Sequence, residues 1–212
     1  MKKNTKIIHI ILIAVITIII LFNQYQVSSL YKVIGGKGGG SSVKGITSVI
    51  PTGIPVVYGV ELNTAYDDIN PNDQKGADAT ISKLGSFDNS IELTGDLFDR
   101  YIKIGTQISC EYCCGAEAII FSNGKAACGC AHSFAMRGLA KYLLKNHADE
   151  FTDDQILEEL GKWKTLFFPG IIAQKAAILK EKGIELNYIN LASNKYRGIE
   201  QGKTSGGMVG GC

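Results

Sequence analysis

Apolar residues recur at helical spacing in the second half of the chain, with charged residues on the opposite face. Thr152 and Gln155 form a capping box, which is a frequent start of a helix. Pro169 is expected to end that helix, and Gly183 is expected to end the next one. The pattern therefore predicts three helices, over about residues 133–146, 152–168 and 171–182.

The first half of the chain has shorter signals, which favour strands and turns. Residues 90–94 and 102–108 alternate between apolar and polar side chains, as in a half-buried strand. Residues 118–128 surround the pair Asn123-Gly124, which suits a tight β-hairpin turn. We therefore expect an α+β fold, in which a small β-rich part and a hairpin precede about three helices.

An apolar run follows three lysines at the N-terminus and spans residues 7–22. It is slightly long for a signal peptide and slightly short for a spanning helix, so both interpretations stay open. The lack of a clear cleavage site favours a transmembrane anchor over residues 7–27. Because positive charges before a span stay in the cytoplasm, we expect residues 1–6 inside and the C-terminal domain outside. The expected protein is thus a single-pass membrane protein.

Composition and charge divide the rest of the chain. Residues 28–49 contain GGKGGGSS and read as a flexible linker, residues 50–191 as an extracytoplasmic α+β domain, and residues 192–212 as a Gly-rich tail. Residues 1–60 have a net charge of +6, whereas residues 61–212 hold 16 basic and 20 acidic residues, a net charge of −4. Nucleic-acid binding needs a clustered basic face, so we expect no nucleic-acid partner. The protein partner stays open.

Five of the six cysteines lie within 21 residues of one another. A C-x-x-C-C turn and a C-x-C-x-H turn flank the expected hairpin, which would bring both turns to one end. Thiolates that converge in this way bind soft metal ions. The primary predicted ligands are Cys110, Cys113, Cys128 and Cys130, with Cys114 and His132 in reserve.

The cysteine pattern resembles treble-clef and zinc-ribbon sites, in which a knuckle, a hairpin and a second ligand pair hold one zinc ion. The stretch Cys128-Gly129-Cys130 is also weakly similar to proteins with a PCYCGC motif. The whole layout resembles uncharacterised archaeal membrane-anchored, cysteine-rich proteins with a CEYCCG…CGCAHS core. That resemblance implies membrane attachment and no assigned activity.

Three roles compete for the cysteines: a metal site, a disulfide framework, or a thiol–disulfide oxidoreductase that uses Cys110 and Cys113. Concentration of the thiols on two short turns favours metal. Zinc is the first candidate, while copper(I) and an iron–sulfur cluster stay open because both select sulfur ligands. His132 is either a ligand or a locally hydrogen-bonded residue of the helix start.

We therefore expect a membrane-tethered, extracytoplasmic metal-binding protein, with a structural or a transported metal. The alternatives are the oxidoreductase and a disulfide-stapled interaction domain. Catalysis is left open and less favoured, because no arrangement of catalytic residues stands out. Cys212 ends the sequence and could join the site, pair with another chain or be inert.

Overall fold

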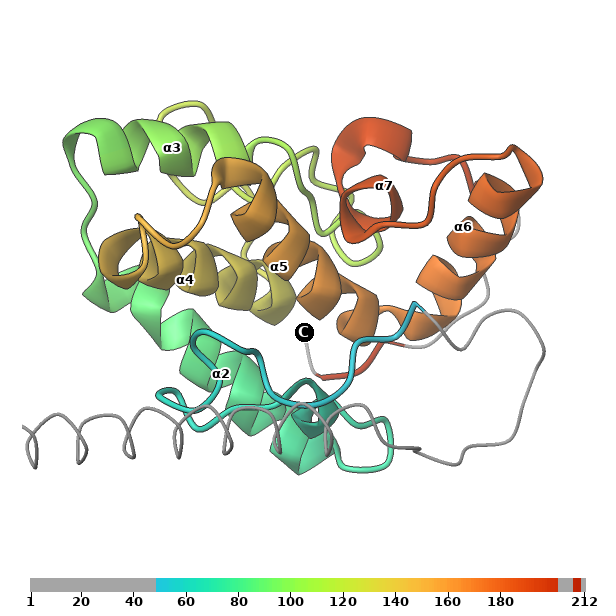
Figure 1. The fold of residues 1–212 in the computed structure, drawn as a ribbon, viewed down its shortest axis with the longest axis horizontal. Coiled ribbons are helices and arrows are strands. Elements are labelled where there is room, and N and C mark those ends of the chain that lie inside the picture. The colour runs from blue at the N-terminus through green and yellow to red at the C-terminus, as the bar shows by residue number, and fades with distance from the viewer. Residues whose placement is uncertain (1–48, 202–207, 211–212) are drawn as a thin grey trace, which may run out of the picture. The chain divides into compact units, whose positions relative to one another are not determined.

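A computed structural model describes residues 49–201 and 208–210 (Figure 1). In these residues the regular structure is helical, with two short 3-10 helices, η1 (Tyr66–Asp68) and η2 (Asn194–Tyr196). The α-helices are α2 (Gln74–Ser90), α3 (Gly95–Gly105), α4 (Ala131–Asn146), α5 (Asp153–Phe167), α6 (Pro169–Glu181) and α7 (Tyr188–Ala192). They belong to one compact unit.

The predicted α+β fold is wrong, because the described residues contain no strand. Residues 102–108, expected as a strand, lie largely in α3. Tyr101 and Ile104 are both buried, and their helical spacing outweighs the alternation that suggested a strand. The expected hairpin over 118–128 is reduced to one antiparallel bridge between Ile120 and Ala126.

The three helices predicted in the second half are confirmed as α4, α5 and α6. The capping box of Thr152 and Gln155 begins α5, as expected. Pro169 does more than end this helix, since it is also the first residue of α6. Proline is well suited to that position, because N–H groups of the first turn have no intrahelical partner and proline lacks an N–H.

Membrane attachment through residues 7–27 is not supported. That segment, the cytoplasmic residues 1–6 and nearly all of the linker 28–49 lie outside the described residues. In the described ranges no helix combines the length and apolarity needed to cross a bilayer. The predicted membrane partner and single-pass topology are therefore withdrawn.

Helices α2 and α4 cross at two glycines. A methyl group on Gly138 of α4 would overlap the backbone carbonyl oxygen of Leu84 in α2. A methyl group on Gly85 of α2 would overlap the ring of Phe134. The absence of side chains at these positions lets the two backbones approach closely.

The segment before α2 is attached to α5 through the buried carboxylate of Glu159. Tyr58 and Tyr66 donate their hydroxyl protons to Glu159 Oε2 at 2.8 and 2.6 Å. Trp163 Nε1 donates to the Tyr58 hydroxyl at 2.7 Å, and Lys162 Nζ lies 2.6 Å from Glu159 Oε1. These bonds satisfy a carboxylate that would be costly to bury alone.

Candidate metal centre

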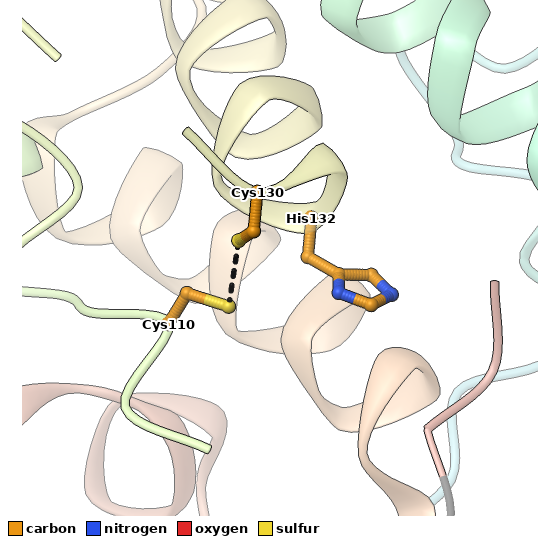
Figure 2. A group of neighbouring side chains, drawn as sticks. All are labelled: Cys110, Cys130 and His132. Atoms are coloured by element: carbon orange, nitrogen blue, oxygen red, sulfur yellow. Dashed lines mark hydrogen bonds between the residues drawn. The ribbon is translucent and has the colours of Figure 1, made fainter. Parts of the chain in front are cut away.

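Two free thiols meet at the start of α4. Cys130 is the N-cap residue of this helix, and its sulfur accepts a hydrogen bond from Ser133 N–H at 3.3 Å. Cys110 lies in the loop after α3 and is fully buried. Its sulfur lies 3.1 Å from that of Cys130 (Figure 2). The helix start therefore presents one sulfur directly to the other.

His132 joins the two sulfurs from the first turn of α4. Its Nε2 lies 2.9 Å from the carbonyl oxygen of Val209, and because a carbonyl only accepts, Nε2 carries the proton. The rings of Phe167 and Phe168 pack against the imidazole at centroid distances of 4.8 and 5.0 Å. Figure 2 shows the other ring nitrogen on the side of the sulfurs.

Cys110, Cys130 and His132 can thus direct their ligand atoms at one point. One atom from each of the three lies within 4.8 Å of the other two. Cys110 and His132 are fully buried, and Cys130 is half-buried. The group combines two soft sulfur donors with one imidazole nitrogen, a set that suits zinc and copper.

The two thiols have opposite acidities. The hydrogen bond from Cys110 lowers the pKa of Cys130 most; burial opposes it, and His132 and the Ser133 N–H add to it. The same hydrogen bond raises the pKa of Cys110, and burial raises that pKa further. Both shifts therefore favour the thiolate at Cys130 over the thiolate at Cys110.

The remaining predicted ligands are placed differently. Cys114 and Cys128 form a disulfide, with Cα atoms 6.7 Å apart. Cys113 is also disulfide-bonded. The sulfurs of Cys114, Cys128 and Cys130 still lie within 4.8 Å of one another, with Cys114 exposed and Cys128 buried. The structure therefore brings together the free thiols of Cys110 and Cys130 with His132, and the disulfide lies beside them.

The loop that carries the disulfide is held by α4 through Arg137. Its guanidinium donates to the carbonyl oxygen of Cys128 at 2.8 Å and to Asp88 Oδ2 of α2 at 2.7 Å. This arginine is buried, and the charged hydrogen bonds compensate for its desolvation. One side chain thereby fixes Cys128 relative to both α4 and α2.

A buried charged group next to Cys110 was not predicted from the sequence. Lys164 of α5 lies 3.0 Å from Glu111 Oε1 and 2.8 Å from the carbonyl oxygen of Ala192. Burial lowers the pKa of Lys164 to about 8, although Glu111 opposes this change. The positive charge of Lys164 also favours a thiolate at Cys110. The sequence signal was Glu111 itself, an acid inside the first cysteine turn.

The arrangement supports two kinds of chemistry: coordination of a soft ion by three side chains, and exchange between neighbouring sulfurs. The likeness to treble-clef sites and to archaeal cysteine-rich proteins stays a prediction. No protein-family model, curated protein or solved structure matches this chain.

Proposed function

We propose that this chain is a metal-binding protein in which Cys110, Cys130 and His132 hold one thiophilic ion, with zinc as the first candidate. The observation that carries the proposal is the convergence of three ligand atoms within 4.8 Å. Two of the three are held in place by hydrogen bonds: Cys130 by the helix start, and His132 by Val209. Preset ligands of this kind lower the ordering cost of coordination.

Charge favours zinc over copper(I). Two thiolates neutralise a divalent cation, so a zinc complex at this site carries no net charge. Copper(I) would leave one negative charge in a site where Cys110 and His132 are fully buried. Burial of an unbalanced charge is costly, although Lys164 near Cys110 would offset part of that cost. An iron–sulfur cluster needs four protein ligands, which these three side chains do not supply, whereas a zinc ion held by three side chains can take water as its fourth ligand.

Coordination requires a small movement of the sulfurs. In a tetrahedral site with zinc–sulfur bonds of 2.3 Å, two sulfurs are about 3.8 Å apart. Here they are 3.1 Å apart and share a proton, so zinc would displace that proton and separate them slightly. Rotation of the half-buried Cys130 side chain can provide this change. Because two ligands are fully buried, we propose a structural metal that exchanges slowly.

The test is metal content after purification without reducing agent, followed by demetallation and reloading with Zn²⁺ alone or Cu(I) alone. We expect one zinc per chain, with copper(I) bound more weakly in competition. The variants Cys110→Ser and His132→Gln should each weaken zinc binding by at least tenfold. Chelation should lower the unfolding temperature, since an ion that binds only the native state stabilises that state.

The matched control is the double variant Cys114→Ser/Cys128→Ser. It removes two cysteines from the same turns and keeps all three proposed ligands, so its zinc content should be unchanged. Circular dichroism checks that each variant keeps its helices. The proposal fails if folded wild-type protein binds no zinc or copper(I), or if the control variant loses the metal while Cys110→Ser retains it.

A further inference from the structure

The Cys130 sulfur belongs to two groups at once. It lies 3.1 Å from the Cys110 sulfur, and it also lies within 4.8 Å of both sulfurs of the Cys114–Cys128 disulfide. A dithiol and a disulfide therefore stand side by side, with Cys130 between them. Disulfides rearrange when a thiolate attacks one of the two sulfurs, so the reactants of such an exchange are already in place.

We propose that the protein carries an internal thiol–disulfide relay, in which Cys130 transfers the disulfide between the surface pair Cys114–Cys128, named for the exposed Cys114, and the pair Cys110–Cys130. No metal is needed for this activity. The relay also does not use the pair Cys110 and Cys113 that the sequence suggested, because Cys113 is already disulfide-bonded. The surface pair is the one that an external protein disulfide or dithiol can reach, since Cys114 is exposed.

In the first step the Cys130 thiolate attacks Cys128. A Cys128–Cys130 bond forms, the Cys114–Cys128 bond breaks, and its electron pair leaves on Cys114. An exposed leaving thiolate is hydrated, which favours attack on Cys128 over attack on Cys114. The intervening Gly129 has open space where a side chain would be, so the short bridge can form without a clash.

In the second step the Cys110 sulfur attacks Cys130. A Cys110–Cys130 bond forms, the Cys128–Cys130 bond breaks, and Cys128 leaves as a thiolate. The backbone N–H of Cys130 already lies 3.5 Å from the Cys128 sulfur and can stabilise this charge. The proton of Cys110 ends on the released pair. One disulfide and one dithiol are present before and after, so no external oxidant is required.

The test uses metal-free protein, so its outcome does not depend on the proposed zinc site. Free thiols are blocked at neutral pH with N-ethylmaleimide, and the protein is digested with trypsin. Cleavage at lysine and arginine separates residues 104–125, which carry Cys110, Cys113 and Cys114, from residues 126–137, which carry Cys128 and Cys130. In wild-type protein we expect blocked thiols both at Cys110 with Cys130 and at Cys114 with Cys128.

The variant Cys110→Ser isolates the first step, since the resolving thiol is missing. We expect the peptide 126–137 to lose two hydrogens through an internal Cys128–Cys130 bond, with Cys114 blocked by N-ethylmaleimide. In the matched variant Cys130→Ser the attacking sulfur is absent, so Cys114–Cys128 should stay intact and only Cys110 of the remaining three cysteines should be blocked. The relay is refuted if Cys110→Ser shows no Cys128–Cys130 bond and wild-type Cys114 and Cys128 stay unblocked.

Discussion

His132 Nε2 and the carbonyl oxygen of Val209 lie 2.9 Å apart, although 77 residues separate them in the sequence. The Val209 N–H donates in turn to the carbonyl oxygen of Phe167 at 2.9 Å. The backbone of Val209 thus fixes the orientation of the imidazole, with its second ring nitrogen on the side of the sulfurs. Residues near the C-terminal end of the sequence therefore complete a site that begins at Cys110.

This contact predicts a large effect of Gly210→Ala. Gly210 has a φ of +87°, and a methyl group there would overlap Cδ1 of Ile81. We expect a loss of about 2–3 kcal/mol in the free energy of unfolding, from backbone strain and overlap together. The measurement is chemical denaturation, with zinc affinity as a second readout because Val209 would shift.

Gly183→Ala is the matched control for that variant. Gly183 has a similar φ of +70° and open space around it, so its alanine variant suffers backbone strain alone. We expect a loss of about 1–2 kcal/mol and unchanged zinc affinity. The role of Val209 would be contradicted if Gly210→Ala and Gly183→Ala lost the same stability and the same zinc affinity.

Gly138→Ala tests the crossing of α2 and α4. The added methyl would meet the backbone of Leu84, which cannot move aside as a flexible side chain can. We expect a loss of about 1–3 kcal/mol in the free energy of unfolding. Gly129→Ala, where the methyl would enter open space, should change stability by less than about 0.5 kcal/mol. Similar denaturation midpoints for the two variants would rule out the close approach.

Glu159→Ala should be strongly destabilising because it removes the common acceptor of Tyr58 and Tyr66. Both hydroxyls are in buried hydrogen bonds, and each would lose a charged partner. A single hydrogen bond to a charged group contributes about 1.5–3 kcal/mol, so a loss in or above this range is expected by denaturation. Glu158→Ala, one residue earlier on α5, is the control and should have little effect. A Glu159→Ala variant as stable as this control would contradict the network.

His147 at the end of α4 predicts a pH dependence of stability. Burial lowers the pKa of His147. Glu150 and Glu61, each 2.6 Å from a ring nitrogen, raise this pKa by more than burial lowers it, so the net pKa is raised. Because the folded-state pKa is above the unfolded one, this stabilisation is fully present below the unfolded pKa of about 6.5. It is lost as the pH rises through the folded pKa.

The measurement is an NMR titration of His147 in wild-type protein and in Glu61→Gln. The variant should titrate at a lower pH than wild type, and its stability should depend less on pH between mildly acidic and mildly alkaline conditions. Glu185→Gln, a substitution of another acid elsewhere in the fold, serves as the control. A His147 pKa at or below that of a free histidine would refute the ion pairs.

The sequence predicted those parts of the fold that local signals determine. The capping box at Thr152 is complete within four residues, so α5 could be placed accurately. Helix α2 was missed because its sequence is rich in Gly, Ser and Asp, which weaken the helical signal. Ile81 and Leu84 of α2 are buried, and Leu84 contacts α4, so packing between the two helices stabilises α2 where the local sequence does not. Helix α3 was misread because isoleucines at alternate positions also fit a strand.

The site shows the same division. The convergence of Cys110 and Cys130 could be predicted because the chain reverses direction between the two cysteine turns, and the Ile120–Ala126 bridge keeps this reversal. The pairing of Cys114 with Cys128 depends on how those turns are oriented in space, which spacing does not specify. The burial of Lys164 beside Glu111 depends on α5 packing against a loop 53 residues earlier. Such long-range placements need the complete fold.

The thiolate of Cys130 caps the first turn of α4, and His147, which is cationic below its raised pKa, caps the last turn. The peptide dipoles of a helix sum to a positive N-terminal end and a negative C-terminal end, so each charge lies at the end that attracts it. Each such interaction contributes about 0.3–1 kcal/mol. Oxidation of Cys130 would remove the anion from the positive end. The first turn of α4 would then fray more readily, so amide hydrogen exchange there would report the redox state of one sulfur.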